Sequence, residues 1–208
     1  MLNFAVAKYQ FVKIGKIFLF SYMNEIKKMV EVLRAGGLIL YPTDTVWGIG
    51  CDATNEEAVK KIFKLKNRED SKSLIVLVDS VDRLSAYVED VPDVAWDLAE
   101  LADKPLTIIY PKGKNLAKNV MAEDGSVGIR VTNEEFSKAL CYAFRKPIIS
   151  TSANISGNPT PQNFYEIEDA IKEGVDYVAE ARREEDEKKY PSSIIKFEKN
   201  GTFVVLRQ

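Results

Sequence analysis

The chain has 208 residues, of which 46% are hydrophobic and 29% are charged, and its formal net charge is −2. This composition is typical of a soluble globular protein, and the near-neutral charge argues against a protein that coats nucleic acid. The sequence contains no histidine, which excludes Ser-His-Asp hydrolases, Cys-His proteases and zinc sites built on histidine.

The cysteines and the apolar runs indicate a cytoplasmic protein. Cys51 and Cys141 are too few for a disulfide scaffold and suit a reducing compartment. No stretch of about 18 apolar residues occurs, so no membrane span is expected. The first 22 residues hold three lysines and no signal-peptide pattern, so we interpret residues 1–23 as an extension and residues 24–208 as one domain. Met23, directly before the domain, is a candidate first residue.

Helical and strand patterns alternate along the domain, which predicts an α/β fold with a buried sheet. Helices are expected at residues 24–35 (ended by Gly36-Gly37), after a cap at Asn55, and at 82–87, 93–102, 133–144 and 164–173. Strands are expected at residues 38–41, 74–78, 106–110, 127–131, 147–150, 194–197 and 203–206, the last two joined by a hairpin turn at Asn200-Gly201. Residues 42–50 and 151–162 are predicted loops, and the charge run 182–189 is interpreted as a solvated loop.

Hydroxyl groups and a carboxylate follow the first predicted strand. Residues 41–50 read Tyr-Pro-Thr-Asp-Thr-Val-Trp-Gly-Ile-Gly. The strand therefore delivers Thr43, Asp44 and Thr45 into a loop that contains glycine, where Trp47 could cover a small polar ligand. An ordinary strand-to-helix turn with a buried tryptophan is the alternative.

A group of cations lies beyond the second predicted helix, at Lys64, Lys66, Arg68 and Lys72. In an extended segment Lys66 and Arg68 point to the same side, because side chains alternate with a period of two. Two cations on one face suit polyphosphate, which arginine can bind with both ends of its fork. Solvated charge at a helix C-terminus explains the same residues without a ligand.

Two later segments also carry polar groups that suit an anionic ligand. Arg130 lies in an apolar strand, where an unpaired charge is costly, so it needs an anionic ligand or an internal salt bridge. Residues 150–157, Ser-Thr-Ser-Ala-Asn-Ile-Ser-Gly, offer hydroxyls and an amide that could cradle phosphates or a nucleoside, although a Ser/Thr-rich turn is also consistent. Neither a P-loop nor a Gly-x-Gly-x-x-Gly motif occurs.

These four segments, in this order, resemble the YrdC-like family over residues 24–208. The most specific segments are residues 41–48, Lys66-Asn-Arg68, 126–130 and 150–157. The resemblance implies a twisted mixed β-sheet flanked by helices, with a large concave ligand site. It also implies a nucleotidyltransferase that makes L-threonylcarbamoyladenylate and pyrophosphate from L-threonine, bicarbonate and ATP. A separate tRNA threonylcarbamoyl transferase would then modify the adenosine next to the anticodon.

The resemblance also implies roles for individual residues. Thr45, Arg130 and Ser193 are expected to bind threonine, with Arg130 on its carboxylate. Lys66 and Arg68 are expected to act on phosphate during catalysis. The residues expected along ATP are Arg68, Lys72, Ser126, Ser150, Ser152, Asn154, Thr160 and Arg207.

The implied reaction needs no histidine, because the attacking carbamate oxygen is already anionic. Catalysis would rest on positioning and on stabilisation of charge. Mg²⁺ is expected with ATP, held by phosphate oxygens and water, and no protein metal ligand is expected. The alternative function is a module that binds structured RNA without catalysis, and contact with tRNA or double-stranded RNA is left open.

Overall fold

The fold begins with a helix that stops at two glycines. The computed structural model describes residues 20–67 and 74–208, and helix α1 covers residues 20–34. The amide of Gly36 donates to Leu33 O at 3.0 Å and that of Gly37 to Val32 O at 2.9 Å. Gly36 has a φ of +72°, which glycine adopts without strain. The predicted first helix and its stop signal are therefore confirmed.

Tyr22 ties the start of this helix to the rest of the fold. Its ring packs edge-on against Phe136 with centroids 5.6 Å apart, and its hydroxyl donates to Glu135 O at 3.2 Å. The predicted domain boundary at residue 23 thus falls inside α1. Residues 1–19 lie outside the described residues, so the extension stays a prediction there.

A single mixed sheet of nine strands forms the centre of the described structure, in the order β7-β1-β2-β6-β3-β5-β4-β8-β9. The strand pairs β1·β7, β3·β5 and β4·β8 are parallel, and the other neighbours are antiparallel. The strands are β1 Ile39–Tyr41, β2 Gly48–Gly50, β3 Ile75–Val78, β4 Leu106–Tyr110, β5 Val127–Val131, β6 Ile148–Ser152, β7 Tyr177–Val178, β8 Ser193–Phe197 and β9 Phe203–Arg207. The expected mixed α/β sheet is confirmed.

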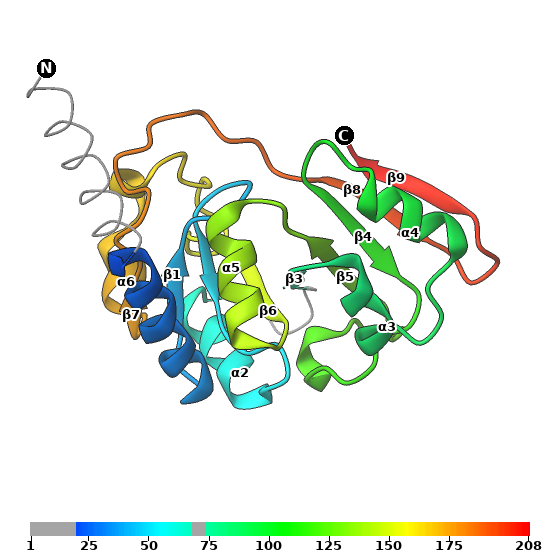
Figure 1. Cartoon of the computed structure of the whole chain (residues 1–208), viewed down its shortest axis with the longest axis horizontal. Coiled ribbons are helices and arrows are strands. Elements are labelled where there is room, and N and C mark those ends of the chain that lie inside the picture. Colours follow the sequence, from blue (N-terminus) through cyan, green and yellow to red (C-terminus); the bar gives the residue numbers. More distant parts are fainter. Residues whose placement is uncertain (1–19, 68–73) are drawn as a thin grey trace, which may run out of the picture.

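Helices cover this sheet and its edges. They are α2 Glu56–Leu65, α3 Leu84–Tyr87, α4 Asp93–Glu100, α5 Glu135–Phe144 and α6 Asp169–Glu173, with short 3₁₀ turns η1 Val81–Arg83, η2 Lys118–Val120 and η3 Phe164–Glu166. Figure 1 shows α1 and α6 beside β7 at one edge of the sheet and the β8–β9 hairpin at the opposite edge. The segment between β7 and β8, drawn in orange, arches along one end of the sheet from one side of the molecule to the other.

Local signals explain most of these boundaries. The side chain of Asn55 accepts from the amides of Glu57 and Ala58 at 3.1 Å each, which caps α2 as predicted. The predicted strands at residues 106–110 and 127–131 coincide with β4 and β5. Apolar residues dominate both strands and their side chains are mostly buried, and this pattern is typical of strands covered on both faces.

Four segments differ from the sequence predictions. Residues 48–50 form β2 inside a predicted loop, and β7 was not predicted. The predicted helix 82–87 is divided into η1 and α3, and the predicted helix 164–173 is divided into η3 and α6. A β-carbon on Gly50 would lie 2.9 Å from Ile149 O, so this strand needs glycine for close approach to β6 rather than an apolar pattern.

The core lies on both faces of the sheet and under α1, α2 and α5. Met29 and Leu33 of α1, Ile62 of α2 and Phe136 and Leu140 of α5 are all buried. Helix α5 packs on β3, and α4 packs on β4 and β5. Within residues 20–67 and 74–208, no helix is both long enough and apolar enough to cross a membrane.

Candidate active site

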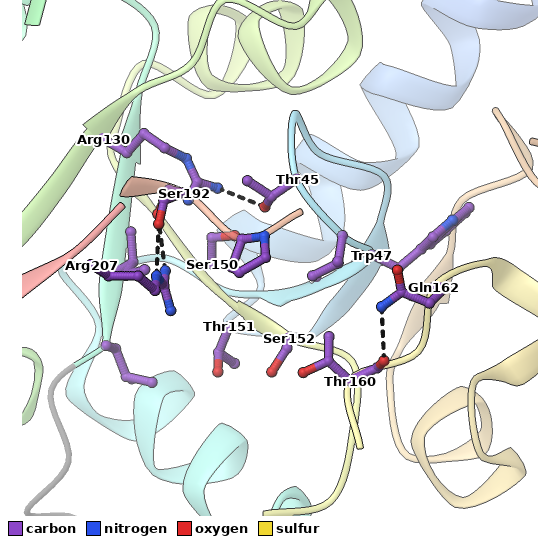
Figure 2. Close-up of a pocket in the computed structure, with 15 residues that line it drawn as sticks. Thr45, Trp47, Arg130, Ser150, Thr151, Ser152, Thr160, Gln162, Ser192 and Arg207 are labelled. Carbon is purple, nitrogen blue, oxygen red and sulfur yellow. Dashed lines mark hydrogen bonds between the residues drawn. The ribbon is translucent and has the colours of Figure 1, made fainter. Parts of the chain in front are cut away.

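A cavity of about 310 Å³ opens where β2 and β6 meet the start of β8 and the end of β9. Figure 2 shows Arg130 and Thr45 at one end of this cavity and Ser152 and Thr160 at the other, with Ser150 between them. The other lining residues include Trp47, Thr151, Gln162, Ser192 and Arg207. We call it the main cavity.

A hydroxyl turn fixes Thr45 at one end of the main cavity. Thr43 Oγ1 accepts from the amide of Thr45 at 3.1 Å and donates to Val46 O at 2.7 Å. The two threonine hydroxyls lie 3.1 Å apart, and both side chains are buried. Short side-chain bonds of this kind compete with regular structure, so residues 43–46 form a turn and not a longer strand.

Arg130 is the buried cation of this end. Its residue is 3% exposed, its Nη2 lies 3.0 Å from Asp44 Oδ1 and it approaches Thr45 Oγ1 at 3.4 Å. Its Nε is buried and has no hydrogen-bond partner among the described residues. Burial raises the pKa of the Asp44 carboxyl, and the opposite charge of Arg130 only partly offsets this effect. The salt bridge is therefore incomplete, and Arg130 keeps a donor for a further acceptor.

A second guanidinium, that of Arg207, lies on the same side of the main cavity as Arg130, with Ser192 between them (Figure 2). Arg207 Nε donates to Ser192 O at 2.8 Å and Nη2 approaches Ser192 Oγ at 3.4 Å, while Ser192 Oγ lies 2.8 Å from Thr107 Oγ1. Burial and the positive charge of Arg130 both lower the pKa of Arg207. Arg130 has Asp44 as its ion-pair partner, whereas the printed contacts of Arg207 are to the uncharged Ser192, so the two guanidiniums together favour an anionic ligand beside them.

The opposite end of the main cavity is neutral and hydroxyl-rich. Ser150 and Ser152 line it from β6, and Thr160 lines it from the following loop. Gln162 Nε2 donates to Thr160 O at 3.3 Å, while its buried Oε1 has no hydrogen-bond partner within the described residues. Trp47 closes one side and packs on Phe164 with ring centroids 5.0 Å apart. Such a wall can donate to phosphate oxygens and can contact an apolar ring.

Lys66 supports this end from behind. The sequence predicts that it faces phosphate, but its buried ammonium donates to the carbonyl oxygens of Ser152 and Asn154. The amide of Ser156 donates back to Lys66 O at 2.8 Å. The side chain of Asn154 also binds the backbone of this loop, since its Nδ2 donates to Asn158 O at 2.8 Å. Lys66 and Asn154 therefore hold the loop after β6 in place.

The main cavity brings together half of the residues predicted from the sequence. Its wall contains Thr45, Arg130, Ser150, Ser152, Thr160 and Arg207. Its lining does not include Lys66, Ser126, Asn154 or Ser193. Arg68 and Lys72 lie outside the described residues, so their roles stay predictions.

Simple geometry explains why Ser193 and Ser126 do not line the main cavity. Ser193 is replaced there by Ser192, because neighbouring residues of an extended chain face opposite sides. Ser126 precedes β5 by one residue, and its amide donates to Asp124 Oδ1 at 2.9 Å. It lies four residues before Arg130, about 13 Å along the strand, and so at some distance from the Arg130 end.

Sequence reasoning also missed Gln162, Ser192 and the role of the charged segment. The segment 182–189 is not simply solvated. Arg182 Nη1 lies 2.8 Å from Glu134 Oε1, its Nε and Nη2 bind the carboxylate of Glu185 at 2.7 Å each, and Nη1 also donates to Thr43 O at 3.3 Å. The segment is thereby anchored on the turn that carries Thr45. The Pro-Ser-Ser sequence before β8 was the available signal for Ser192.

The donor set of the main cavity bears on the Mg²⁺ that is expected with ATP. Among the described residues, no group of three His, Cys, Asp or Glu side chains could hold a metal ion. The hydroxyl-rich end offers neutral oxygens from Ser150, Ser152, Thr160 and Gln162 and no carboxylate. This fits Mg²⁺ that is bound mainly by phosphate oxygens and water, and it does not fit an ion held by the protein alone.

Comparison with known proteins identifies relatives of this chain. The Sua5/YciO/YrdC family model, described as "Telomere recombination", matches residues 31–208. A Pseudoalteromonas translucida protein named threonylcarbamoyl-AMP synthase is 35% identical over 160 residues, which cover 76% of this chain and 86% of the relative.

Two solved structures share the fold and 27–28% of the sequence. P. abyssi Sua5 in complex with L-threonine has a TM-score of 0.77 at 28% identity, and the match covers 88% of this chain and 53% of that one. This chain thus spans about half of P. abyssi Sua5. E. coli YciO has a TM-score of 0.76 at 27% identity, with 88% of each chain covered.

Proposed function

This chain belongs to the Sua5/YciO/YrdC family, and from that premise we propose that it is a threonylcarbamoyl-AMP synthase. In this reaction L-threonine, bicarbonate and ATP give L-threonylcarbamoyladenylate and pyrophosphate. One observation carries the proposal. A single cavity joins an anion-binding end at Arg130 and Thr45 to a hydroxyl-rich end at Ser150 and Ser152.

The Arg130 end suits the carboxylate and hydroxyl of threonine. The free Nε donor of Arg130 is available to the carboxylate, and the buried hydroxyl of Thr45 lies next to it. Ser192, just before β8, and Arg207 of β9 complete this end. Charge-assisted bonds to a planar guanidinium are short and directional, so they orient the amino acid as well as bind it. The relative from P. abyssi, whose structure contains L-threonine, supports this assignment.

The Ser150 end suits ATP. Hydroxyls of Ser150, Ser152 and Thr160 would donate to phosphate oxygens, and Trp47 would cover an apolar part of the ligand. Lys66 keeps the loop after β6 in the shape that this contact needs. Arg68 and Lys72 are proposed as further phosphate ligands on the resemblance alone. Mg²⁺, carried in with ATP, would supply charge neutralisation at the phosphates.

The reaction then follows from positioning. The threonine amine attacks bicarbonate, and water leaves to give the carbamate. A carbamate oxygen attacks the α-phosphorus, and the bond to the bridging oxygen breaks, so that pyrophosphate leaves with both electrons. The chain holds both partners within one cavity and stabilises the developing negative charge with fixed donors, which is where most of the rate enhancement in such sites comes from.

An RNA-binding module without catalysis is not favoured. A concave site of about 310 Å³ lined by Arg130, Arg207 and small hydroxyl side chains suits a small anionic ligand better than a broad RNA surface. We assign the product to a separate tRNA threonylcarbamoyl transferase. The cytoplasmic location, where such a partner and ATP occur, belongs to the same proposal.

The test is pyrophosphate release with one substrate omitted at a time. Release should require ATP, L-threonine and bicarbonate together, and the product should co-elute with chemically prepared threonylcarbamoyladenylate. Equal release without threonine would contradict the proposal. Saturable RNA binding with no release under any condition would favour the RNA-binding alternative.

A further inference from the structure

A second cavity lies on the other side of the Asp44–Arg130 salt bridge. Its volume is about 260 Å³, and we call it the side cavity. Asp44 lines the side cavity while Arg130 lines the main cavity, and the two side chains approach to 3.0 Å. One ion pair therefore separates the two cavities at the end where Thr45 lies.

The side cavity is built from segments outside the predicted motifs. Its walls come from the end of α4, the loop to β4, the start of α5 and the 182–189 segment. The lining residues are Asp44, Ala99, Ala102, Asp103, Lys104, Pro105, Leu106, Val131, Asn133, Glu134, Arg182 and Lys189. The acidic and basic side chains are equal in number, three of each.

Some of these charges are already paired, and the others face the opening. Arg182 binds Glu134 and Glu185, and Lys189 lies 3.1 Å from Glu187 Oε2. Lys104 and Asp103 are exposed at the rim, and the described residues give neither an ion-pair partner. A rim with a free ammonium and a free carboxylate, above a buried carboxylate at Asp44, complements a zwitterion.

We propose that the side cavity is the port through which the free amino acid reaches Arg130. The inference rests on the proposed function and adds a route to it. Lys104 attracts the carboxylate of the incoming amino acid, and Asp103 and Asp44 attract its ammonium. The carboxylate then passes to the free Nε donor of Arg130 at the boundary between the two cavities.

The arrangement of the main cavity explains why a second route is needed. Arg130 and Thr45 lie at one end of the main cavity, and the hydroxyl-rich end where ATP is placed lies at the other (Figure 2). A nucleotide bound there would occupy the part of the main cavity that leads to Arg130. The side cavity reaches the Arg130 end without crossing the nucleotide, so both substrates can bind in either order.

The neighbouring residues Ala102 and Leu101 allow a matched test. Ala102→Phe places a ring in the side cavity, whereas Leu101→Phe changes an adjacent residue that is 76% exposed and does not line either cavity. Threonine binding to the full-length chain is followed by stopped-flow fluorescence, since Trp47 lines the main cavity. Each variant is measured with and without saturating α,β-methylene-ATP. Thermal melting verifies that both variants fold.

Blocking a port slows entry and exit alike and leaves the equilibrium unchanged. With α,β-methylene-ATP bound, Ala102→Phe should lower both the association and dissociation rates of threonine about tenfold, within the one to three decades over which association rates vary in related variants. The dissociation constant should change less than threefold, Leu101→Phe should behave as the wild type, and the ATP analogue should not slow threonine binding in the wild type. Lys104→Glu should slow association in low salt without any packing change.

Three results would overturn the port. Ala102→Phe could match Leu101→Phe while the ATP analogue slows threonine, which would mean a single mouth. Faster dissociation alone in Ala102→Phe would make the side cavity part of the binding site. An unfolded Ala102→Phe protein together with wild-type rates in Lys104→Glu would also contradict it. A wild-type chain that binds no threonine would instead refute the proposed function.

Discussion

Arg130→Ala separates a substrate-binding role from a structural one. In the folded chain Arg130 is 3% exposed and its partner Asp44 has a side chain that is 11% exposed. Removing the guanidinium leaves the Asp44 carboxylate buried without compensation, which costs about 3 kcal/mol of folding free energy. For a chain of this size that corresponds to a fall in Tm of roughly 6–12 °C.

The effect on catalysis should be larger and should concern threonine specifically. A lost charge-stabilising donor costs roughly 3–4 kcal/mol, or about a hundred- to a thousand-fold in kcat/KM for threonine. The KM for ATP should change little, because the Ser150 end is untouched. Pyrophosphate release at varied threonine and fixed saturating ATP measures the first quantity, and the converse titration measures the second.

Two companion variants identify the cause. The double variant Asp44→Asn with Arg130→Met removes both charges, so it should regain most of the lost stability but none of the activity. Lys146→Ala breaks the pair between Lys146 Nζ and Asp52 Oδ2, which are 2.7 Å apart and away from the main cavity, and should leave threonine kinetics unchanged. If Arg130→Ala loses stability yet keeps kcat/KM for threonine within threefold, Arg130 is only the structural partner of Asp44.

Four further predictions concern other parts of the molecule. Lys66→Met should lower the free energy of unfolding by roughly 1–3 kcal/mol, because two buried carbonyls lose a donor. In steady-state assays it should raise the KM for ATP more than the KM for threonine. Unchanged thermal melting would contradict the supporting role of Lys66. Arg68→Ala should reduce turnover about a hundred- to a thousand-fold with nearly unchanged melting, and Arg68→Lys should recover only part of it; near-normal release at saturating ATP would remove Arg68 from the phosphate site. The pKa of Asp44 is raised in the folded chain, so the folded state binds this proton more tightly than the unfolded state does. The free energy of unfolding of the wild type relative to Asp44→Asn should therefore increase as the pH falls through the pKa of Asp44, which urea titrations between pH 7 and pH 4 would measure. A decrease would mean that the charge of Arg130 outweighs burial. Asn55→Ala removes the cap of α2 and should cost about 1 kcal/mol without any change in KM, which thermal melting and the same assays would check.

The sequence by itself determined the elements whose signals are local. The apolar runs of β4 and β5 and the cap at Asn55 specify structure through neighbouring residues, and each was predicted at or near its observed boundary. The chain also reveals which residue types the site would use. The serine-rich run after β6 and the arginine within β5 are unusual enough to indicate an anion site before any contact is known.

Only the tertiary structure decided what these side chains face. Strand β2 exists because two glycines allow close pairing with β6, and no periodic pattern marks it. Ser192 lines the main cavity in place of Ser193 because the register of β8 on β4 sets the direction of alternation. Lys66 turns to carbonyls that lie 86 and 88 residues away in sequence, and Arg182 anchors a charge run that looked solvated. Local pattern fixes backbone conformation through neighbours a few residues apart, whereas the partner of a buried charge is chosen by whichever distant segment packs against it.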